Sequence, residues 1–450
     1  MKEKINKRII FEILAIVLIA IFCISLTPKT LQNDTFYTIK IGEHIIQEKG
    51  IDMIDPFSWH ENLEYTYPHW LYDVIIYGIY SLGGMTGIYI STCIFAIILG
   101  ITVYIVNSKL ARNQVVSFFI TIGVMYMLKD YITARAQLVT FILFILQIFA
   151  IEKLIETKQK RYGLALIIIS ILVANLHVAV WPFTFVLYLP YIAEYIIAIL
   201  EEKTAKKFGK EIKQGEKILT EKKDGVKLLV IVMIICILTG LLTPLGTTPY
   251  TYLVKTMQGN TTDNINEHQP LILINDSAVI SAIIILLAIL IFTKVKIRLS
   301  DLIMLGGLTL LMFYSKRQST IWVLVGGIIL NKLIYSLLEK DADKKAINSI
   351  ISKFGIFALI VVMLSASFYL IRPKLKTQYI DESLYPVQMS EFILNYFEEN
   401  NIDRAKVRLY NEYNYGSYLL YRDIPVFIDS RADLYAPEFN GGRDIFTDFI

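Results

Sequence analysis

Long runs of uncharged, apolar residues recur along the 450-residue sequence and constrain its fold more than any other feature. Such runs are typical of helices that cross a lipid bilayer, because a helix needs roughly 20 apolar residues to span the hydrocarbon core. Hydrophobic residues make up 55% of the chain, which is more than a soluble domain of this size carries. The sequence therefore predicts a polytopic membrane protein built around an all-α transmembrane bundle.

We expect eleven transmembrane helices, several of them near the lower length limit of about 17 residues. The apolar run 71–82 is too short to span. Because Gly83 and Gly84 separate it from the next run, it predicts a helix that lies in the interface or re-enters the membrane. The predicted spans are 9–26, 85–106, 112–128, 136–151, 162–181, 183–200, 227–243, 277–293, 299–314, 320–338 and 354–371.

Basic residues indicate how these spans are oriented, because cytoplasmic segments of membrane proteins carry more Lys and Arg than outer loops. With a cytoplasmic N-terminus, the inner segments carry 27 Lys and Arg, the outer loops carry 8, and the tail after the last span holds the other 9. A cleaved signal peptide is the alternative reading of the first span. Its eighteen apolar residues are long for the hydrophobic region of a signal peptide, and no small-residue cleavage site follows, which favours a retained helix.

This topology divides the chain into a transmembrane domain (1–371) with a long outer first loop (27–70), a charged cytoplasmic linker (201–226) and an extracytoplasmic tail (372–450). All histidines and all tryptophans fall at or near the outer face, which indicates that any chemistry takes place there. We expect a multi-pass protein of the plasma membrane. No basic–aromatic patch suggests nucleic-acid binding, and the three cysteines lie inside apolar runs as small hydrophobic residues.

The first outer loop contains three candidate site residues, each with a simpler structural interpretation. Asp34 precedes a periodic stretch that ends at Gly50, so it is either a helix N-cap or a carboxylate held just above the membrane. Asp55 precedes a proline and is either a turn former or a second site carboxylate. His69 is either a polar residue at the membrane interface or a site residue. The rest of the loop predicts a hairpin-like segment.

The tail predicts a small α/β unit. Segment 386–400 has the periodicity of an amphipathic helix, and 407–411 and 425–429 read as parallel strands joined by a short helix at 415–421. Asp429, Arg431 and Asp433 follow the second strand, where they form either a ligand site or a local salt-bridged turn. The chain stops at Ile450 without a capping pattern, which leaves the completeness of this unit open.

Several of these motifs together resemble bacterial membrane proteins related to the glycosyltransferase-C superfamily, in a branch similar to mannosyltransferases that use polyprenyl-phosphate sugars. The resemblance covers nearly the whole chain. It rests on Asp34-Thr35-Phe36-Tyr37, Gly42-Glu43, Gly50, Asp55-Pro56-Phe57-Ser58, His69-Trp70-Leu71, Ala134-Arg135-Ala136-Gln137, Asn175-Leu176-His177, Pro244-Leu245-Gly246, Lys316-Arg317, Tyr415-Gly416-Ser417-Tyr418-Leu419 and the segment 427–435. The sequence departs from the branch at Ala136, Thr243 and His69, where proline, asparagine and an acidic residue are usual.

The resemblance implies a transferase that moves a sugar from a polyprenyl-phosphate carrier to a cell-envelope glycan or protein acceptor at the outer face. Asp34 matches the catalytic carboxylate of the first loop. One general base suffices for direct displacement, because a phosphate leaves as a stable anion. The departing phosphate needs cations, and Arg135, Lys316 and Arg317 lie at predicted outer helix ends. Snorkelling to lipid headgroups is the alternative role of these three residues.

The sequence also contains further site candidates and allows alternative functions. His177 and Glu43 are further site candidates, whereas Asn175 is expected to form interhelical hydrogen bonds. No spacing specifies a metal site, although Asp34, Asp55 and His69 would suit a divalent cation if they converged. A non-catalytic relative that binds envelope polymers or lipids is the alternative function. A transporter is disfavoured, because Glu12 and Glu194 stand alone in their predicted spans and no inverted repeat is evident.

Overall fold

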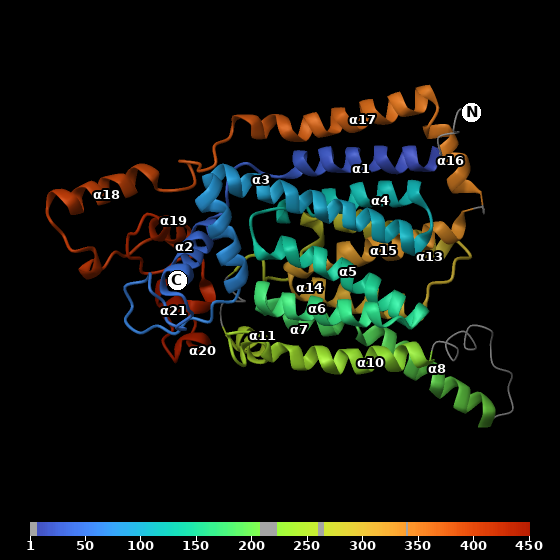
Figure 1. Ribbon diagram of the computed structural model, residues 1–450, viewed down its shortest axis with the longest axis horizontal. Helices are drawn as coiled ribbons and strands as arrows, with labels where there is room; N and C mark the ends of the chain where they lie inside the picture. Colours follow the sequence, from blue (N-terminus) through green and yellow to red (C-terminus); the bar gives the residue numbers. More distant parts are fainter. Residues whose placement is uncertain (1–6, 208–222, 260–264, 339–340) are drawn as a thin grey trace.

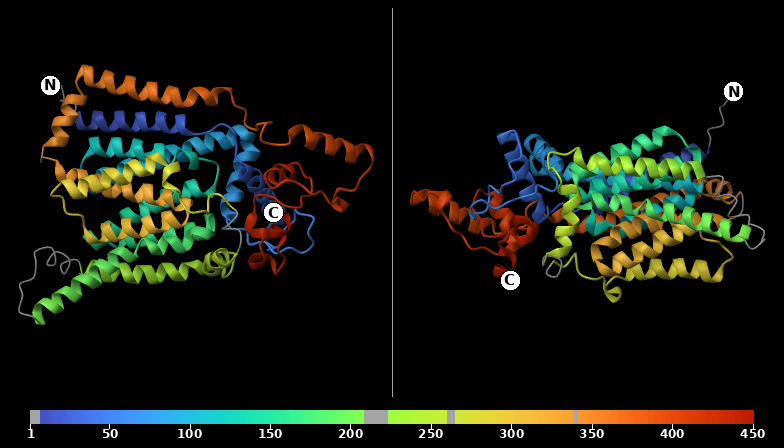
Figure 2. Two further views of the ribbon diagram at one scale, coloured as in Figure 1. Left: turned by 180° about the vertical axis from the view of Figure 1, so that it is seen from behind. Right: turned by 90° about the horizontal axis from the view of Figure 1, so that it is seen from below.

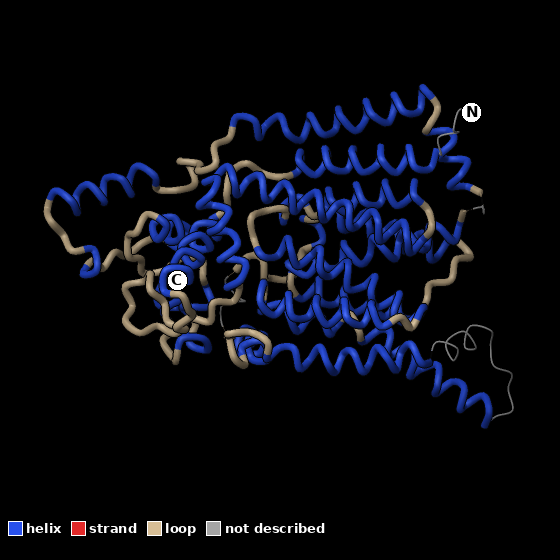
Figure 3. The backbone as a smooth tube through the Cα atoms, in the orientation of Figure 1, coloured by secondary structure: helices blue, strands red, loops and turns tan. Residues whose placement is uncertain are grey.

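The computed structural model describes residues 7–207, 223–259, 265–338 and 341–450, and within these ranges the regular secondary structure is entirely helical (Figure 3). The α-helices are α1 (Lys7–Leu26), α2 (Asn33–Glu48), α3 (Trp70–Ala111), α4 (Gln114–Met127), α5 (Ala136–Thr157), α6 (Lys160–Leu176), α7 (Trp181–Val186), α8 (Leu189–Lys207), α10 (Lys223–Leu238), α11 (Thr248–Gln258), α13 (Ser277–Phe292), α14 (Leu299–Tyr314), α15 (Ser319–Leu337), α16 (Ala342–Ile350), α17 (Lys353–Ile371), α18 (Val387–Glu399), α19 (Tyr413–Tyr421), α20 (Pro437–Asn440) and α21 (Ile445–Phe449). Short 3₁₀ helices are η1 (Lys129–Tyr131), η2 (Val178–Val180), η3 (Thr239–Leu241), η4 (Leu273–Asn275), η5 (Lys316–Gln318), η6 (Arg372–Lys376), η7 (Arg404–Lys406) and η8 (Ala432–Tyr435).

Seven helical segments in the described part of the chain are long and apolar enough to cross a membrane. They are Lys7–Leu26, Trp70–Ala111, Ala136–Thr157, Val178–Thr204, Lys223–Leu241, Lys316–Leu337 and Lys353–Lys376. The predicted spans 112–128, 162–181, 277–293 and 299–314 fall on α4, α6, α13 and α14, which have only 14, 17, 16 and 16 residues. Helix length therefore supports a multi-helix membrane protein but not the full set of eleven crossings, because 16 residues rise only about 24 Å.

The long helices pack side by side in one bundle (Figure 1). In the most apolar part of α5, 72% of the residues are buried, compared with 11% for α17, so α5 lies at the centre and α17 at the margin. Several helix starts have capping side chains: Asn113 accepts a hydrogen bond from the backbone N–H of Val116 at 2.9 Å, and Ser352 does the same for Gly355 at 3.0 Å. Such caps satisfy backbone donors that the helix itself leaves unpaired.

A kink at Gly84 divides α3, as the sequence predicted for the boundary between 71–82 and the following span. Gly84 has φ +57° and ψ −150°, a conformation that strains any residue with a side chain. Before the kink the chain runs across the end of the bundle, and after it α3 runs along the bundle (Figure 1). Leu82 is 92% exposed at the end of the first part.

The first loop and the tail pack together at one end of the bundle, opposite the end near the N-terminus (Figures 1 and 2). They share one hydrophobic core, in which Leu63 and Tyr67 of the loop pack with Val426 and Tyr435 of the tail. We call this unit, residues 27–70 and 372–450, the head. The linker prediction for 201–226 is covered only at its ends, by α8 and α10, because 208–222 lies outside the described residues.

The α/β prediction for the tail is wrong. Helices α18 and α19 confirm the predicted helices 386–400 and 415–421, but 407–411 and 425–429 form no strands. The Asn411 side chain accepts a hydrogen bond from the backbone N–H of Phe427 at 2.8 Å and donates one to the carbonyl of Ile428 at 2.7 Å. Trp59 of the first loop donates its backbone N–H to Val426 at 3.1 Å. These contacts occupy backbone groups that a parallel neighbour would need.

Candidate functional site

Asp34 lies in the first turn of α2 and faces the bundle. The N-cap prediction is wrong by two positions, because Gln32 occupies the N-cap, and Lys49 rather than Gly50 adopts the left-handed conformation at the other end. Asp34 Oδ2 forms an ion pair with Arg135 Nη2 at a distance of 2.8 Å. Both side chains are mostly buried, with 19% and 24% of their surfaces exposed, so little water competes for the contact.

Arg135 immediately precedes α5 and binds a second carboxylate on its other side. Its Nη1 lies 3.0 Å from Oε1 of Glu267, whose segment precedes α13. Burial lowers the pKa of Arg135, but Asp34 and Glu267 raise it more, so the net shift is upward and the guanidinium stays charged. The Nε atom of Arg135 is buried and has no hydrogen-bond partner among the described residues. Arg135 therefore ties the first loop to the bundle and keeps one donor atom unused.

Glu267 was not identified from the sequence, since no motif marks it. The segment around it is held against η5 by backbone hydrogen bonds, from Arg317 N–H to the Glu267 carbonyl at 3.0 Å and from Lys316 N–H to the Gln269 carbonyl at 2.8 Å. Burial raises the pKa of Glu267, but Arg135 and Arg317 outweigh this effect and lower it. The sequence signal for Glu267 was weak: it is an acidic residue in the predicted outer loop between spans 227–243 and 277–293, and Arg135 is predicted to lie on the same side of the membrane.

Arg317 and Lys316 differ in their surroundings, although both were predicted as phosphate ligands. Lys316 is exposed and lines a cavity of about 450 Å³ between the head-side ends of α4, α13 and α15. Arg317 is half-buried and makes no ion pair or side-chain hydrogen bond within the described ranges. Its charge nevertheless lowers the pKa of His69, of His268 and of Glu267.

The same cavity connects Lys316 to the Arg135 cluster, because Glu267 forms part of its wall. Lys129 and Asp130 of η1 also line it, and Lys129 Nζ lies 5.2 Å from the ring centre of Tyr126. Apolar side chains also line the cavity, namely those of Met127, Val279 and Val323. Asp130, Glu267 and Asp276 line the cavity as well, so its wall carries both cations and carboxylates beside these apolar side chains.

His69 and His177 lie together beside a buried carboxylate. Their ring centres are 5.5 Å apart, and His69 Nδ1 lies 3.9 Å from Oδ1 of Asp73 in α3. His177 Nδ1 is 3.0 Å from the hydroxyl of Thr140. Burial, reinforced by the charges of Arg317 and Arg135, lowers the pKa of His69 to about 3. His69 is therefore a neutral imidazole at physiological pH, and the Asp73 side chain beside it is fully buried.

Asp55 belongs to a different cluster, inside the head. Its Oδ1 lies 2.5 Å from Arg431 Nη1, and its Oδ2 accepts the backbone N–H of Ser58 at 2.8 Å. Arg431 also pairs with Asp429 at 2.7 Å, and all three side chains are at most 2% exposed. Burial raises the pKa of Asp55, but Arg431 lowers it further, so the net shift is downward. This arrangement fits the turn-forming interpretation of Asp55 and the salt-bridged interpretation of Asp429 and Arg431.

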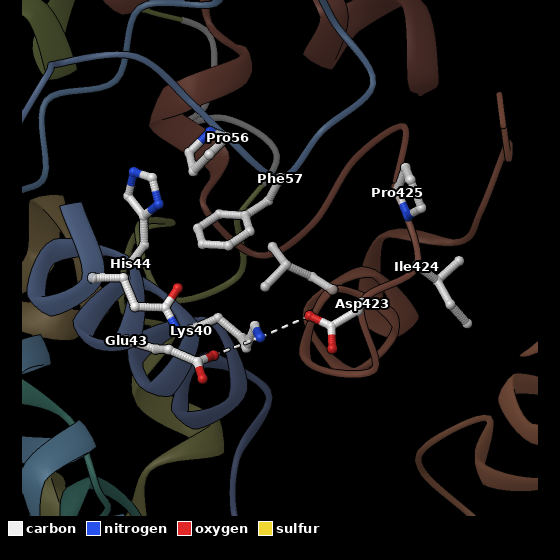
Figure 4. Close-up of a pocket in the computed structure, with 10 residues that line it drawn as sticks. Lys40, Glu43, His44, Pro56, Phe57, Asp423, Ile424 and Pro425 are labelled. Carbon is white, nitrogen blue, oxygen red and sulfur yellow. Dashed lines mark hydrogen bonds and ion pairs between the residues drawn. The ribbon is translucent and has the colours of Figure 1, made fainter. Parts of the chain in front are cut away.

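The remaining candidates are also separated from one another. Asp433 accepts a hydrogen bond from the hydroxyl of Tyr252 in α11 instead of joining Arg431. Glu43 pairs with Lys40 at 2.6 Å and lines a cavity on the head (Figure 4). Within the described ranges, no three His, Cys, Asp or Glu side chains lie close enough to hold a metal ion. Asp34, Asp55 and His69 therefore do not converge on a divalent cation.

A second set of charges lies in the bundle near the end opposite the head, which we call the inner network. Arg298 pairs with Glu194 at 2.8 Å and with Glu152 at 3.0 Å, and Lys332 pairs with Glu152 at 2.9 Å and with Asp301 at 3.2 Å. The expectation that Glu194 stands alone is wrong. Its partner Arg298 is 104 residues away in the sequence, between two predicted spans, so no local pattern reveals the pair.

No protein-family model matches this sequence, and no curated protein shows significant similarity to it. The fold and the site themselves describe a helical membrane protein with a polar cluster where its head meets the bundle. Asp34, Arg135, Glu267, Arg317 and the two histidines make up that cluster, which we call the seam site.

Proposed function

We propose that this protein is a membrane glycosyltransferase that moves a sugar from a polyprenyl-phosphate carrier to a cell-envelope acceptor. The proposal includes the eleven-crossing topology with a cytoplasmic N-terminus, in which the shorter helices α4, α6, α13 and α14 also cross and the head lies outside. It rests on the sequence resemblance and on one structural observation. Asp34 pairs with Arg135, and Arg135 pairs with Glu267 on the wall of a cavity that also contains Lys316.

The cavity suits the phosphate end of a lipid-linked donor. Its volume of about 450 Å³ is in the range of small-molecule sites. Lys129 and Lys316 can contact a phosphate there, although the carboxylates of Asp130, Glu267 and Asp276 also line the cavity. Met127, Val279 and Val323 offer apolar contacts to the first part of a prenyl chain. Arg317 strengthens the case, because a half-buried guanidinium without an acidic partner among the described residues is costly unless an anion binds to it.

The chemistry requires one displacement at the anomeric carbon of the donor sugar. The acceptor oxygen forms a bond to this carbon as the bond to the phosphate oxygen breaks, and the lipid phosphate leaves with the bonding electrons. Asp34 takes the proton of the acceptor hydroxyl, while Arg317 and Lys316 stabilise the phosphate anion. Arg135 holds the Asp34 carboxylate in place. Neutral His69 can share a hydrogen bond with a sugar hydroxyl group without adding charge.

Purified protein incubated with a polyprenyl-phosphate sugar tests this function. The proposal predicts release of polyprenyl phosphate that increases with added envelope acceptor. Intact donor after prolonged incubation with acceptors from several envelope fractions would count against it.

A transporter is a second candidate, because the inner network supplies the paired buried charges that the sequence did not reveal. Transport proteins use such intramembrane charges to bind ions or couple protons, although they also hold helices together. A transport role and a purely structural role of the inner network predict different experimental results. Uptake of a solute into proteoliposomes that is abolished by Glu194→Gln, without loss of folded protein, would favour the transporter.

A further inference from the structure

A cavity of about 300 Å³ lies within the head, away from the seam site, where α2 meets the tail (Figure 4). One face of α2 forms its floor, through Lys40, Glu43, His44 and Gln47 at helical spacing. The opposite wall comes from the tail segment 423–425, and Phe57 of the first loop lies between the two.

The charges in this cavity do not cancel. Lys40 Nζ lies 2.6 Å from Oε2 of Glu43 and 2.7 Å from Oδ1 of Asp423, so two carboxylates share one ammonium group. Burial lowers the pKa of Lys40, but hydrogen bonds to Asp423 and Glu43 raise it by more, which keeps the ammonium charged. One negative charge therefore remains in the cavity, and it disfavours an anionic ligand.

Other groups on the wall are available for hydrogen bonding. The side chains of His44 and Gln47 have no hydrogen-bond partner within the described ranges, although both line the cavity. The ring of His44 meets the edge of the Phe57 ring at a centroid distance of 5.8 Å. Carboxylate, amide and imidazole groups around an apolar ring can bind the hydroxyl groups and the C–H face of a sugar at the same time.

We propose that this cavity is a sugar-binding subsite for an uncharged or amino-bearing saccharide about the size of a mono- or disaccharide. The volume lies at the lower end of the range for small-molecule sites. The unbalanced carboxylate accepts hydrogen bonds from hydroxyl or ammonium groups of such a ligand and repels a uronic acid or a sugar phosphate.

If the protein is a glycosyltransferase, this subsite holds a remote unit of the acceptor, a role that rests on the proposed function. Asp34 and Lys40 are on the same helix, separated by about 9 Å of rise and about 120° of rotation. A single sugar at Asp34 cannot reach around α2 to Lys40. Only an acceptor chain of several units can occupy both places, so the cavity selects for longer acceptors.

Saturation-transfer difference NMR on the full-length protein in detergent micelles tests binding with three probes, methyl glucoside, glucosamine and glucuronate. We expect signals from the first two in the millimolar range, and at least about tenfold weaker binding of glucuronate because of the like charge. The variants His44→Ala and Gln47→Ala should each weaken binding by about three- to tenfold, since each loses one hydrogen bond. Gln388→Ala, an exposed glutamine on α18, is the matched control.

Equal signals from all three probes, no signal from any of them, or unchanged binding in both cavity variants would overturn the proposal. Because no donor lipid is present, this outcome is independent of whether the protein transfers sugar. In a transfer assay, the two variants should raise the KM for long acceptors and leave short acceptors unaffected. If the protein proves to have no transferase activity, the binding result still stands or fails on its own.

Discussion

Arg135 reaches from the start of α5 to Asp34 in the first loop, with 2.8 Å between Nη2 and Oδ2, although 100 residues separate them in the sequence. The contact fastens the head to the centre of the bundle, because α5 is the most buried of the long helices. Through Arg135 and Glu267, it also links Asp34 to the wall of the cavity that contains Lys316.

Removing the unpaired cation should weaken binding of a lipid phosphate. Arg317→Gln is expected to lower the affinity for polyprenyl phosphate by about ten- to a hundredfold, because a charge-assisted contact contributes roughly 1.5–3 kcal/mol. Native mass spectrometry of the purified protein with added polyprenyl phosphate measures this change. Lys376→Gln removes an exposed positive charge from η6 and should leave binding unchanged. Equal losses in the two variants would indicate a general charge effect without a site.

The loop–tail contact through Asp55 and Arg431 should dominate the stability of the head. Asp55→Asn leaves Arg431 with one carboxylate in a fully buried setting, so we expect a loss of about 3–5 kcal/mol. Chemical denaturation in detergent provides the measurement. Lys406→Gln, which breaks the exposed pair with Asp403 at 3.7 Å, should cost less than about 1 kcal/mol. Similar effects of the two changes would contradict the assigned role of Asp55.

Substitution in the inner network should affect stability without affecting the seam site. Glu194→Gln deprives Arg298 of its closest carboxylate, and we expect a lower unfolding temperature with unchanged affinity for polyprenyl phosphate. The two sets of residues lie near opposite ends of the bundle, which is why their effects should separate. A variant with normal stability and lost lipid binding would show that the network acts on the site.

Acidification should lower the stability of the folded protein through His69 of the seam site and through His268. The pKa of His69 is lowered to about 3 and that of His268 to about 4, in both cases mainly by burial and also by the charge of Arg317. Between these values and about 6.5, the unfolded chain binds protons that the folded chain does not, so stability falls as the pH falls. The slope should be at most about 1.4 kcal/mol per pH unit for each histidine. Unfolding temperatures of the wild type and of His268→Gln at pH 7 and pH 5 test this, and equal slopes would contradict it.

The sequence predicted local structure better than tertiary pairing. Apolar runs located the long helices, the pair Gly83 and Gly84 located the kink in α3, and periodicity located α18. The two tail strands were wrong, because Asn411 supplies side-chain hydrogen bonds to segment 425–429 that no propensity predicts.

The candidate site could be predicted only in part, for the same reason. Asp34, Arg135 and the basic residues of η5 were identified from motifs, whereas Glu267 was missed because only its spatial neighbours give it a role. The assignment of Asp55 depended on Arg431, which is 376 residues away. Such partners are set by how the helices and the head pack, and a local sequence pattern does not contain that information.

Transfer of labelled sugar by wild type and by Asp34→Asn tests the central claim most directly. The substitution keeps the shape of the side chain and removes its ability to take a proton, so we predict a loss of at least about a hundredfold in turnover of the folded protein, with donor binding retained. Asp403→Asn, an exposed aspartate of the head that does not line this cavity, is the matched control and should retain activity. Turnover by Asp34→Asn equal to that of the wild type would contradict the account and would favour a non-catalytic binding protein.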